Sequence, residues 1–348
     1  MNINSNKSGS ISNPLISIIL PVYNGQKFLD KSIQSILDQT YSHFELIVVD
    51  DCSTDLTPDI IKRFEKLDSR IKSFRNPFNK KLPASLNLGH KVASGDYFTW
   101  TSDDNLLRNN FLQVLVEHIS ERDSDLIFAN YFLVDYQGEV LKPFIAGPLT
   151  KIFIANVWGC AFLYKRVVYE DLKGYDENLY LVEDYDFWLR AICKFKAEHI
   201  SDFIYYYRIH EDSLSSKIES NELYKYKLEK GIRTIFLKVG KDMGWSKTTI
   251  LMTPDLYFNK NIGDINLLLN TKDSLIKDWM KSVSLKGDES KSLSLLLYKR
   301  IREILLKDNV KLNFFMLIIV LIKAPKLLLH PKFSKKYTLQ ILRKCVRI

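Results

Sequence analysis

Short apolar runs alternate with helical patterns between Leu15 and Ile119, and this alternation constrains the fold more than any other feature of the chain. LISIIL at 15–20 and FELIVV at 44–49 are continuous apolar runs, which is typical of strands covered on both faces. Between them, the apolar residues of 28–37 recur on one helical face. Strands that alternate with helices form βαβ units around a parallel sheet. The sequence therefore predicts an α/β domain.

The remaining elements follow from the same patterns. Thr57-Pro58 opens a second helix, because proline suits the first helical position. Further strands are predicted at 70–75, 96–101, 126–134, 139–145, 158–164 and 199–208, and further helices at 86–92 and 181–195.

Paired acids stand directly behind two of the predicted strands. Asp50 and Asp51 follow the strand at 44–49, and Asp103 and Asp104 follow the strand at 96–101. Open α/β sheets bind ligands outside the carboxyl ends of their strands, where such pairs need a cation or strong donors. Turn and helix-cap chemistry explains either pair alone equally well, since Asp, Ser and Asn are favoured there.

Several function classes are excluded by short motifs. The 13 glycines form no G-x-G-x-x-G, P-loop or G-x-S-x-G pattern, and the six histidines form no H-E-x-x-H. These absences exclude dinucleotide oxidoreductases, P-loop NTPases, ordinary α/β-hydrolases and zincin proteases. The four cysteines are widely spaced, which fits buried thiols in a reducing cytosol.

Five segments, taken together and in this order, resemble family 2 glycosyltransferases. They are ISIILPVYNGQKFLDKSIQSILDQTYSHFELIVVDDCSTD (16–55), KLPASLNLGHKVASGDYFTWTSDDN (81–105), WGCAFLYKR (158–166), GYDENLYLVEDYDFWLRA (174–191) and YRIHEDSLS (207–215). The resemblance implies a GT-A fold: a Rossmann-like, mostly parallel sheet flanked by helices, here with a helical, basic C-terminal extension. The polar, Ser/Asn-rich start of the chain predicts a disordered leader (1–14). It is followed by a catalytic domain (15–220) with a nucleotide half (15–105) and an acceptor half (106–220), and by a helical C-terminal region (221–348).

The activity that the resemblance implies is inverting and metal-dependent. A sugar would move from a nucleotide donor, a UDP-sugar, to a hydroxyl of a growing bacterial surface glycan or a lipid-linked acceptor. Mn²⁺ or Mg²⁺ would stabilise the charge that develops on the departing diphosphate. The alternative is a catalytically silent GT-A subunit that binds sugar nucleotides or serves as a scaffold in a polysaccharide assembly complex.

The same resemblance assigns site residues. The nucleotide-binding set is Pro21, Val22, Tyr23, Asn24, Asp51, Lys81 and Asp103. The metal ligands are Asp104, Asp103 and His210, although a histidine near a strand end is as often structural. Asp184, at the start of a predicted helix, matches the catalytic base, and Glu183 would position the acceptor. A routine helix cap is the ordinary alternative for Asp184, and an exposed lysine is the ordinary alternative for Lys81.

Three further residues in these motifs carry expectations. Trp158 and Gly159 would line the sugar pocket, although a core aromatic explains Trp158 equally well. Arg208 is expected to pair with an acid or a phosphate. The first acid of the family's usual acidic motif is replaced by Thr101, which leaves the number of protein ligands to the metal open.

The net charge of +9 resides in one segment. The tail 301–348 has 11 Lys+Arg and two Asp+Glu, which equals the excess of the whole chain, so the other residues are balanced. This tail contains FFMLIIVLI at 314–322, nine apolar residues where a membrane span needs roughly 20. An apolar helix flanked by lysines suits an anionic membrane surface; a buried helix with solvated lysines is the alternative. We expect a cytoplasmic protein, peripheral on the inner face of the membrane, with no nucleic-acid partner, and homodimerisation stays open.

Overall fold

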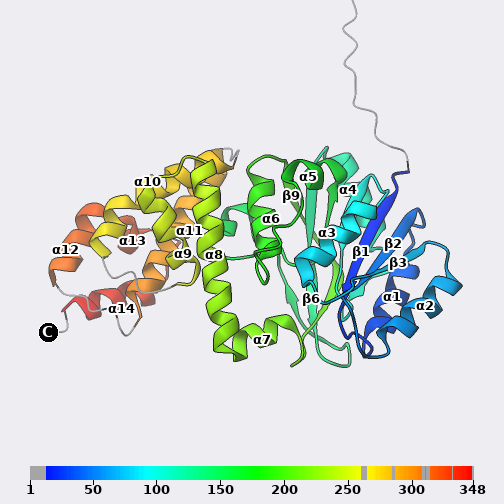
Figure 1. Ribbon diagram of the computed structural model, residues 1–348. Coiled ribbons are helices and arrows are strands. Elements are labelled where there is room, and N and C mark those ends of the chain that lie inside the picture. The colour runs from blue at the N-terminus through cyan, green and yellow to red at the C-terminus, as the bar shows by residue number, and fades with distance from the viewer. Residues whose placement is uncertain are drawn as a thin grey trace, which may run out of the picture. The chain divides into compact units, whose positions relative to one another are not determined.

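The computed structural model describes residues 13–259, 265–283, 287–307, 310, 314–330 and 332–346 (Figure 1). The leader predicted at 1–14 lies outside the described residues, apart from its last two positions. The chain forms two compact units: the first comprises 1–146, 158–191 and 195–222, and the second comprises 147–157, 192–194 and 223–348. The second unit therefore takes in two short segments that the sequence division assigns to the catalytic domain.

A nine-stranded sheet organises the first unit, in the order β3-β2-β1-β4-β8-β6-β9-β5, with β7 paired to β6. Strands β3, β2, β1 and β4 are mutually parallel, β6 pairs with β9 in parallel, and the other pairs are antiparallel. The bounds are β1 Ile16–Val22, β2 Phe44–Asp50, β3 Ile71–Arg75, β4 Tyr97–Trp100, β5 Leu106–Leu107, β6 Leu126–Val134, β7 Val140–Phe144, β8 Phe162–Lys165 and β9 Ala197–Arg208.

Helices cover both faces of the parallel strands, as predicted. On β1, Ile18 and Leu20 belong to the core cluster that includes helices α1, α2 and α4, whereas Ile19 meets Gly89 of helix α3 on the other face. Every residue of β1 and β2 is buried, which explains their continuous apolar sequences. The helices of this unit are α1 Leu29–Leu37, α2 Thr57–Leu67, α3 Leu82–Val92, α4 Phe111–Glu121, α5 Arg166–Leu172, α6 Glu183–Ile192 and α7 Leu214–Ser220.

The second unit is helical, as predicted for the C-terminal region. Its aromatic core includes Phe153 stacked on Trp279 at 5.2 Å, and the Trp245 indole donates to Ser282 Oγ at 2.6 Å. In the described part of the chain, no helix combines the length and the apolar character that crossing a membrane requires. The elements of the second unit are the 3-10 helix η1 Leu149–Phe153 and the helices α8 Glu222–Asp242, α9 Lys247–Tyr257, α10 Ile265–Ser282, α11 Gly287–Leu305, α12 Phe314–Lys323, α13 Lys326–Leu329 and α14 Lys335–Val346.

Candidate active site

The loop that follows β1 is fastened to the loop that follows β2. The Asn24 backbone donates to Ser53 Oγ at 2.9 Å, Asn24 Oδ1 accepts from the Thr54 backbone at 2.8 Å, and the Gly25 backbone donates to Thr57 Oγ1 at 2.9 Å. Pro21 and Val22 are buried inside β1, while Tyr23 is 50% exposed. Of the four consecutive residues predicted to bind the nucleotide, Tyr23 and Asn24 therefore present side chains to solvent.

Asp51 braces the loop before α3. It is buried, and its carboxylate accepts from Asn76 Nδ2 at 2.7 Å and from the backbone N–H groups of Lys80 and Lys81 at 2.8 Å each. Lys81 has a φ of 73°, a left-handed conformation that costs energy for a residue with a side chain. The three hydrogen bonds that Asp51 accepts stabilise that conformation, so Asp51 fixes the position of the Lys81 backbone.

Asp103 packs against the glycine of the first loop. A Cβ atom placed on Gly25 would lie 2.0 Å from Asp103 Oδ2, so no other residue fits at position 25 while this carboxylate keeps its place. Burial, and then the charge of Asp104, raises the pKa of Asp103 to about 8. A group held in this way favours either a proton or a nearby cation.

Asp104 and His210 come together from distant parts of the chain. Asp104 Oδ2 lies 2.9 Å from His210 Nε2, and the other polar atom of each side chain, Oδ1 and Nδ1, is buried without a partner among the described residues. Two neighbouring ligands of an octahedral ion lie about 3 Å apart when each bond is about 2.1 Å. The pair therefore fits a divalent cation, with its remaining positions left to phosphate and water. Nowhere in the described chain do three His, Cys, Asp or Glu side chains converge as a metal-binding group.

Arg208 holds the backbone beside this pair, and among the described residues it forms no ion pair with an acid, so that its pairing with a phosphate stays a prediction. Its guanidinium donates to the carbonyl oxygens of Asp104, Asp135 and Tyr136 at 2.8, 3.1 and 2.6 Å, and it lies over the Phe28 ring at 4.8 Å. The Phe28 ring is also 5.1 Å from the His210 ring. Arg208 and Phe28 together fix the backbone of Asp104 and the imidazole of His210.

Thr101 occupies a place where an acid would be costly. Its hydroxyl bonds to the Tyr205 hydroxyl at 2.7 Å, and both residues are buried. A carboxylate there would lose its hydration without gaining a cationic partner in this pair. This local environment accounts for the threonine and removes position 101 from the set of metal ligands.

Asp184 and Glu183 open helix α6. Leu181, two residues earlier, has a φ of 83°, and Asp184 Oδ1 accepts from the Tyr185 backbone at 2.7 Å. Glu183 is 3% exposed, and its Oε2 has no partner in the described structure. Burial, and then the charge of Asp184, raises the pKa of Glu183 to about 8. Glu183 is therefore the buried acid of the pair.

Tyr207 lies near the end of β9, and its hydroxyl bonds to the Ser215 hydroxyl at 2.7 Å. Burial is the main cause that raises the pKa of this phenol to about 12. The motifs YRIHEDSLS and TSDDN, which are far apart in sequence, meet where His210 contacts Asp104.

Trp158 lies in the core instead of on a pocket wall. Its indole is fully buried and stacked on Phe128, with ring centroids 4.6 Å apart. Gly159 has a φ of 68°, and the Tyr131 ring occupies the space that a Cβ atom would take, 2.3 Å away. Of the two interpretations of Trp158, the structure favours the core aromatic, and the pocket role of Gly159 stays a prediction.

Sequence reasoning missed Gly25, Phe28 and Tyr207. The Asn24-Gly25 dipeptide signals a turn but does not reveal that Asp103 packs against it. Phe28 and Tyr207 each have an ordinary strand or helix alternation as their only local signal, because their roles depend on contacts between distant segments.

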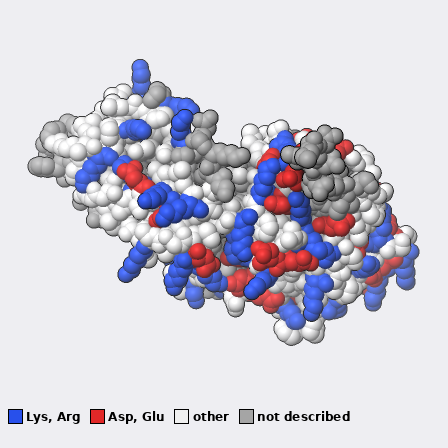
Figure 2. Space-filling view, turned by 90° about the horizontal axis from the view of Figure 1, so that it is seen from above, with Lys and Arg blue, Asp and Glu red and all other residues white. Residues whose placement is uncertain are grey.

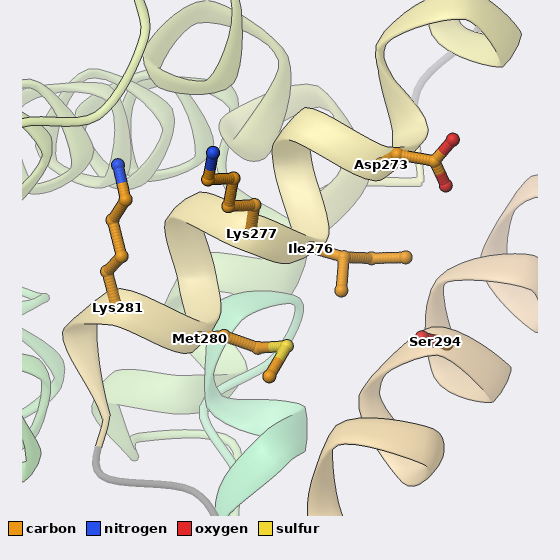
Figure 3. Close-up of a pocket in the computed structure, with 6 residues that line it drawn as sticks. All are labelled: Asp273, Ile276, Lys277, Met280, Lys281 and Ser294. Atoms are coloured by element: carbon orange, nitrogen blue, oxygen red, sulfur yellow. The ribbon is translucent and has the colours of Figure 1, made fainter.

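A shallow pocket of about 470 Å³ lies between α10 and α11 in the second unit (Figure 3). Ile276 and Met280 face the α11 side, and the ammonium groups of Lys277 and Lys281 point away from it. None of the predicted site residues lines it. We assign the candidate active site to the strand ends of the first unit, not to this pocket.

Comparison with known proteins identifies the family. The sequence profile of Glycosyl transferase family 2 matches residues 17–172. An uncharacterized glycosyltransferase of Methanocaldococcus jannaschii is 31% identical over 230 residues, which is 63% of this chain and 79% of that protein. This chain belongs to glycosyltransferase family 2.

Two further similarities concern individual members. TuaG of Bacillus subtilis, a glycosyltransferase named for teichuronic acid biosynthesis, is 30% identical over 210 residues, 58% of this chain and 82% of TuaG. The crystal structure of S. aureus TarS 1–349 with UDP-GlcNAc has a TM-score of 0.58 at 19% identity, and the match covers 83% of this chain and 88% of that TarS 1–349 chain. The likeness to TarS confirms the predicted fold of this family 2 glycosyltransferase.

Proposed function

We propose that this family 2 glycosyltransferase moves a sugar from a UDP-sugar to a hydroxyl of a bacterial surface glycan or a lipid-linked acceptor, with inversion. The observation that carries the proposal is the pairing of Asp104 with His210 beyond the carboxyl ends of β4 and β9. The names of TuaG and of the TarS complex support the choice of surface glycan and of UDP.

The chemistry asked of Asp184 is the removal of one proton. As the acceptor oxygen bonds to the anomeric carbon, the bond from that carbon to the diphosphate oxygen breaks, and its electron pair leaves with UDP. Asp184 takes the proton of the acceptor hydroxyl. A single displacement from the opposite face inverts the anomeric configuration. Asp184 opens α6, where the positive end of the helix dipole favours its ionised form.

Asp104 and His210 would deal with the charge of the leaving group. Asp104 and His210 would hold a divalent cation, with Asp103 beside them. Mn²⁺ or Mg²⁺ bound there would stabilise the negative charge of the departing diphosphate. Arg208 keeps the Asp104 carbonyl in place, and Asp51 fixes the backbone from which Lys81 extends toward the nucleotide.

The deciding experiment uses the full chain with Mn²⁺ and a panel of UDP- and dTDP-sugars, scored by slow hydrolysis of the donor. We expect one UDP-sugar to be hydrolysed, and Asp184→Asn to abolish transfer while metal-dependent UDP binding, measured by calorimetry, persists. Retained turnover in Asp184→Asn would refute the base assignment. UDP binding with no hydrolysis or transfer of any donor would favour the silent scaffold instead.

A further inference from the structure

Helices α12 and α13 expose an apolar face in the second unit. Ile318, Leu321 and Ile322 on α12 are 38, 44 and 73% exposed, and Leu329 on α13 is 72% exposed. Ile318 and Ile322 lie one turn apart on α12, and the exposed Pro325 stands between this helix and Leu329 of α13. We call these five residues the aliphatic patch.

The opposite side of the same helices is fully used in packing. Leu317, Val320, Ala324 and Leu327 are 8% exposed or less. Lys323 Nζ donates to Asn270 Oδ1 of α10 at 2.6 Å, which fixes α12 against α10. The patch is therefore held outward by a packed helix, and turning inward would exchange buried side chains for exposed ones.

Exposed lysines border the aliphatic patch. Lys323 and Lys326 lie within the two helices, and Lys332, Lys335 and Lys336 follow in the segment that begins α14. In the described structure, none of these five lysines forms an ion pair with a carboxylate. Figure 2 shows one face of the molecule, on which the surface of the second unit is mostly uncharged with separate Lys and Arg clusters and little acid.

We propose that the aliphatic patch and its lysines bind the interface of an anionic lipid membrane. Aliphatic side chains enter the boundary between headgroups and acyl chains, and lysines around them meet lipid phosphates. α12 has 10 residues, which suits lying in that interface and not crossing the bilayer. This proposal does not rest on glycosyl transfer, because the binding it predicts needs neither donor nor acceptor.

A second copy of this chain is a poorer occupant. In a two-fold interface the same patch meets itself, so Lys323 and Lys326 would approach the same lysines of the other copy. Like charges brought together in this way oppose association. An anionic surface has the opposite property, and the excess charge of 301–348 favours it.

The test is flotation of the full-length protein with vesicles of phosphatidylcholine alone or of phosphatidylcholine mixed with phosphatidylglycerol. We expect binding to the mixed vesicles, about tenfold weaker binding to the neutral ones, and release by high salt. Equal binding to both kinds, or binding to neither, would overturn the proposal.

Paired variants locate the surface. Ile322→Glu with Leu329→Glu should reduce binding to the mixed vesicles at least about tenfold, and Lys326→Glu with Lys335→Glu and Lys336→Glu should do the same. The matched control is Leu67→Glu with Leu251→Glu, whose side chains are 71 and 58% exposed elsewhere in the chain. This control should bind as the unaltered protein does.

Two readouts keep these variants interpretable. Circular dichroism should be unchanged, because every altered side chain is exposed. Sedimentation without vesicles should show the same mass for the unaltered protein and for the Ile322→Glu, Leu329→Glu variant. A dimer that this variant converts to a monomer would overturn the membrane assignment, as would equal loss of binding in the control variant.

Discussion

Adjacent acids at one strand end differ in what surrounds them. Asp103 packs against Gly25. The Asp104 side chain contacts His210, and its backbone carbonyl oxygen accepts a hydrogen bond from Arg208. The two carboxylates therefore have separate supports, although they are neighbours in sequence. Asp103 depends on the absence of a side chain at position 25, and Asp104 depends on contacts with the end of β9.

Gly25→Ala tests the first of these supports. The new methyl group would overlap Asp103 Oδ2 and also lie 2.6 Å from Val22 Cγ2, so the carboxylate must move. We expect kcat/KM for the donor to fall about 10- to 100-fold, the range that small misplacements in a site produce. Steady-state kinetics measure this, with Gly231→Ala in α8 as the control. An unchanged kcat/KM would mean that the position of Asp103 is unimportant.

The support of Asp104 is tested through metal dependence. Asp104→Ala removes one of the two metal ligands that we propose, so Mn²⁺ should no longer strengthen UDP binding in calorimetry, and adding EDTA should change little. His210→Gln should weaken the Mn²⁺ effect less. The exposed Asp59→Asn on α2 should behave as the unaltered protein. Full Mn²⁺ dependence in Asp104→Ala would show that the cation is held elsewhere.

At the scale of elements, a buried hydrogen-bond chain joins α3, β8, β4 and the turn before α6. His90 Nδ1 lies 2.7 Å from the Leu86 carbonyl oxygen and must donate to it, so Nε2 accepts from Tyr164 at 2.6 Å. Tyr164 accepts from Tyr175 at 3.1 Å, and Tyr175 accepts from Trp100 Nε1 at 2.9 Å. Because the indole can only donate, the direction of the chain is fixed and leaves no acceptor for a second proton on His90.

This chain predicts acid sensitivity. Burial lowers the pKa of His90 from 6.5 to about 3. Below pH 6.5 the unfolded chain therefore binds a proton at this histidine, whereas the folded protein does not. Stability from this group is present above pH 6.5 and is lost as the pH falls. Between pH 7.5 and 5 we expect about 2 kcal/mol of loss, since each pH unit costs about 1.4 kcal/mol.

Urea unfolding across this pH range measures the effect by difference. His90→Gln cannot take up the proton, so its stability should fall less steeply with acid than that of the unaltered protein. His43→Gln, at an exposed histidine, should keep the original slope. Equal slopes in all three proteins would contradict a neutral His90 in the folded state.

Helices and strands could be predicted where the pattern of apolar residues is local. The positions of acidic residues could be predicted where they follow the end of a strand. The buried runs of β1 and β2 and the acids behind β2 and β4 lie as the sequence indicates, because parallel strands end at one edge. The role of Asp51 as a brace for Lys81 was not predictable. It depends on backbone donors from a loop whose path no local pattern specifies.

At the scale of the whole molecule, the chain does not divide at one point. Gly147–Val157, from the middle of the catalytic sequence, belongs to the second unit. Ile152 and Phe153 are fully buried there, and Phe153 stacks on Trp279. The sequence boundary at 220 misses this because the 11 residues 147–157 carry no shift in composition. The aromatic partners of Phe153, Trp245 and Trp279, lie beyond that boundary in the sequence.

Because residues 147–157 belong to the second unit, we can predict how a fragment ending at residue 222 behaves. Without the second unit, Ile152 and Phe153 lose their partners and expose apolar surface, which promotes association. We expect this fragment to bind a hydrophobic dye and to elute as aggregates in size-exclusion chromatography, although its sheet is intact by circular dichroism. Replacing Ile152 and Phe153 by serine in the same fragment should restore a monomer.

The same double substitution in the full chain should destabilise the second unit by several kcal/mol, since each removes a large buried side chain. A monomeric fragment with the natural residues would show that 147–157 finds its packing within the first unit alone.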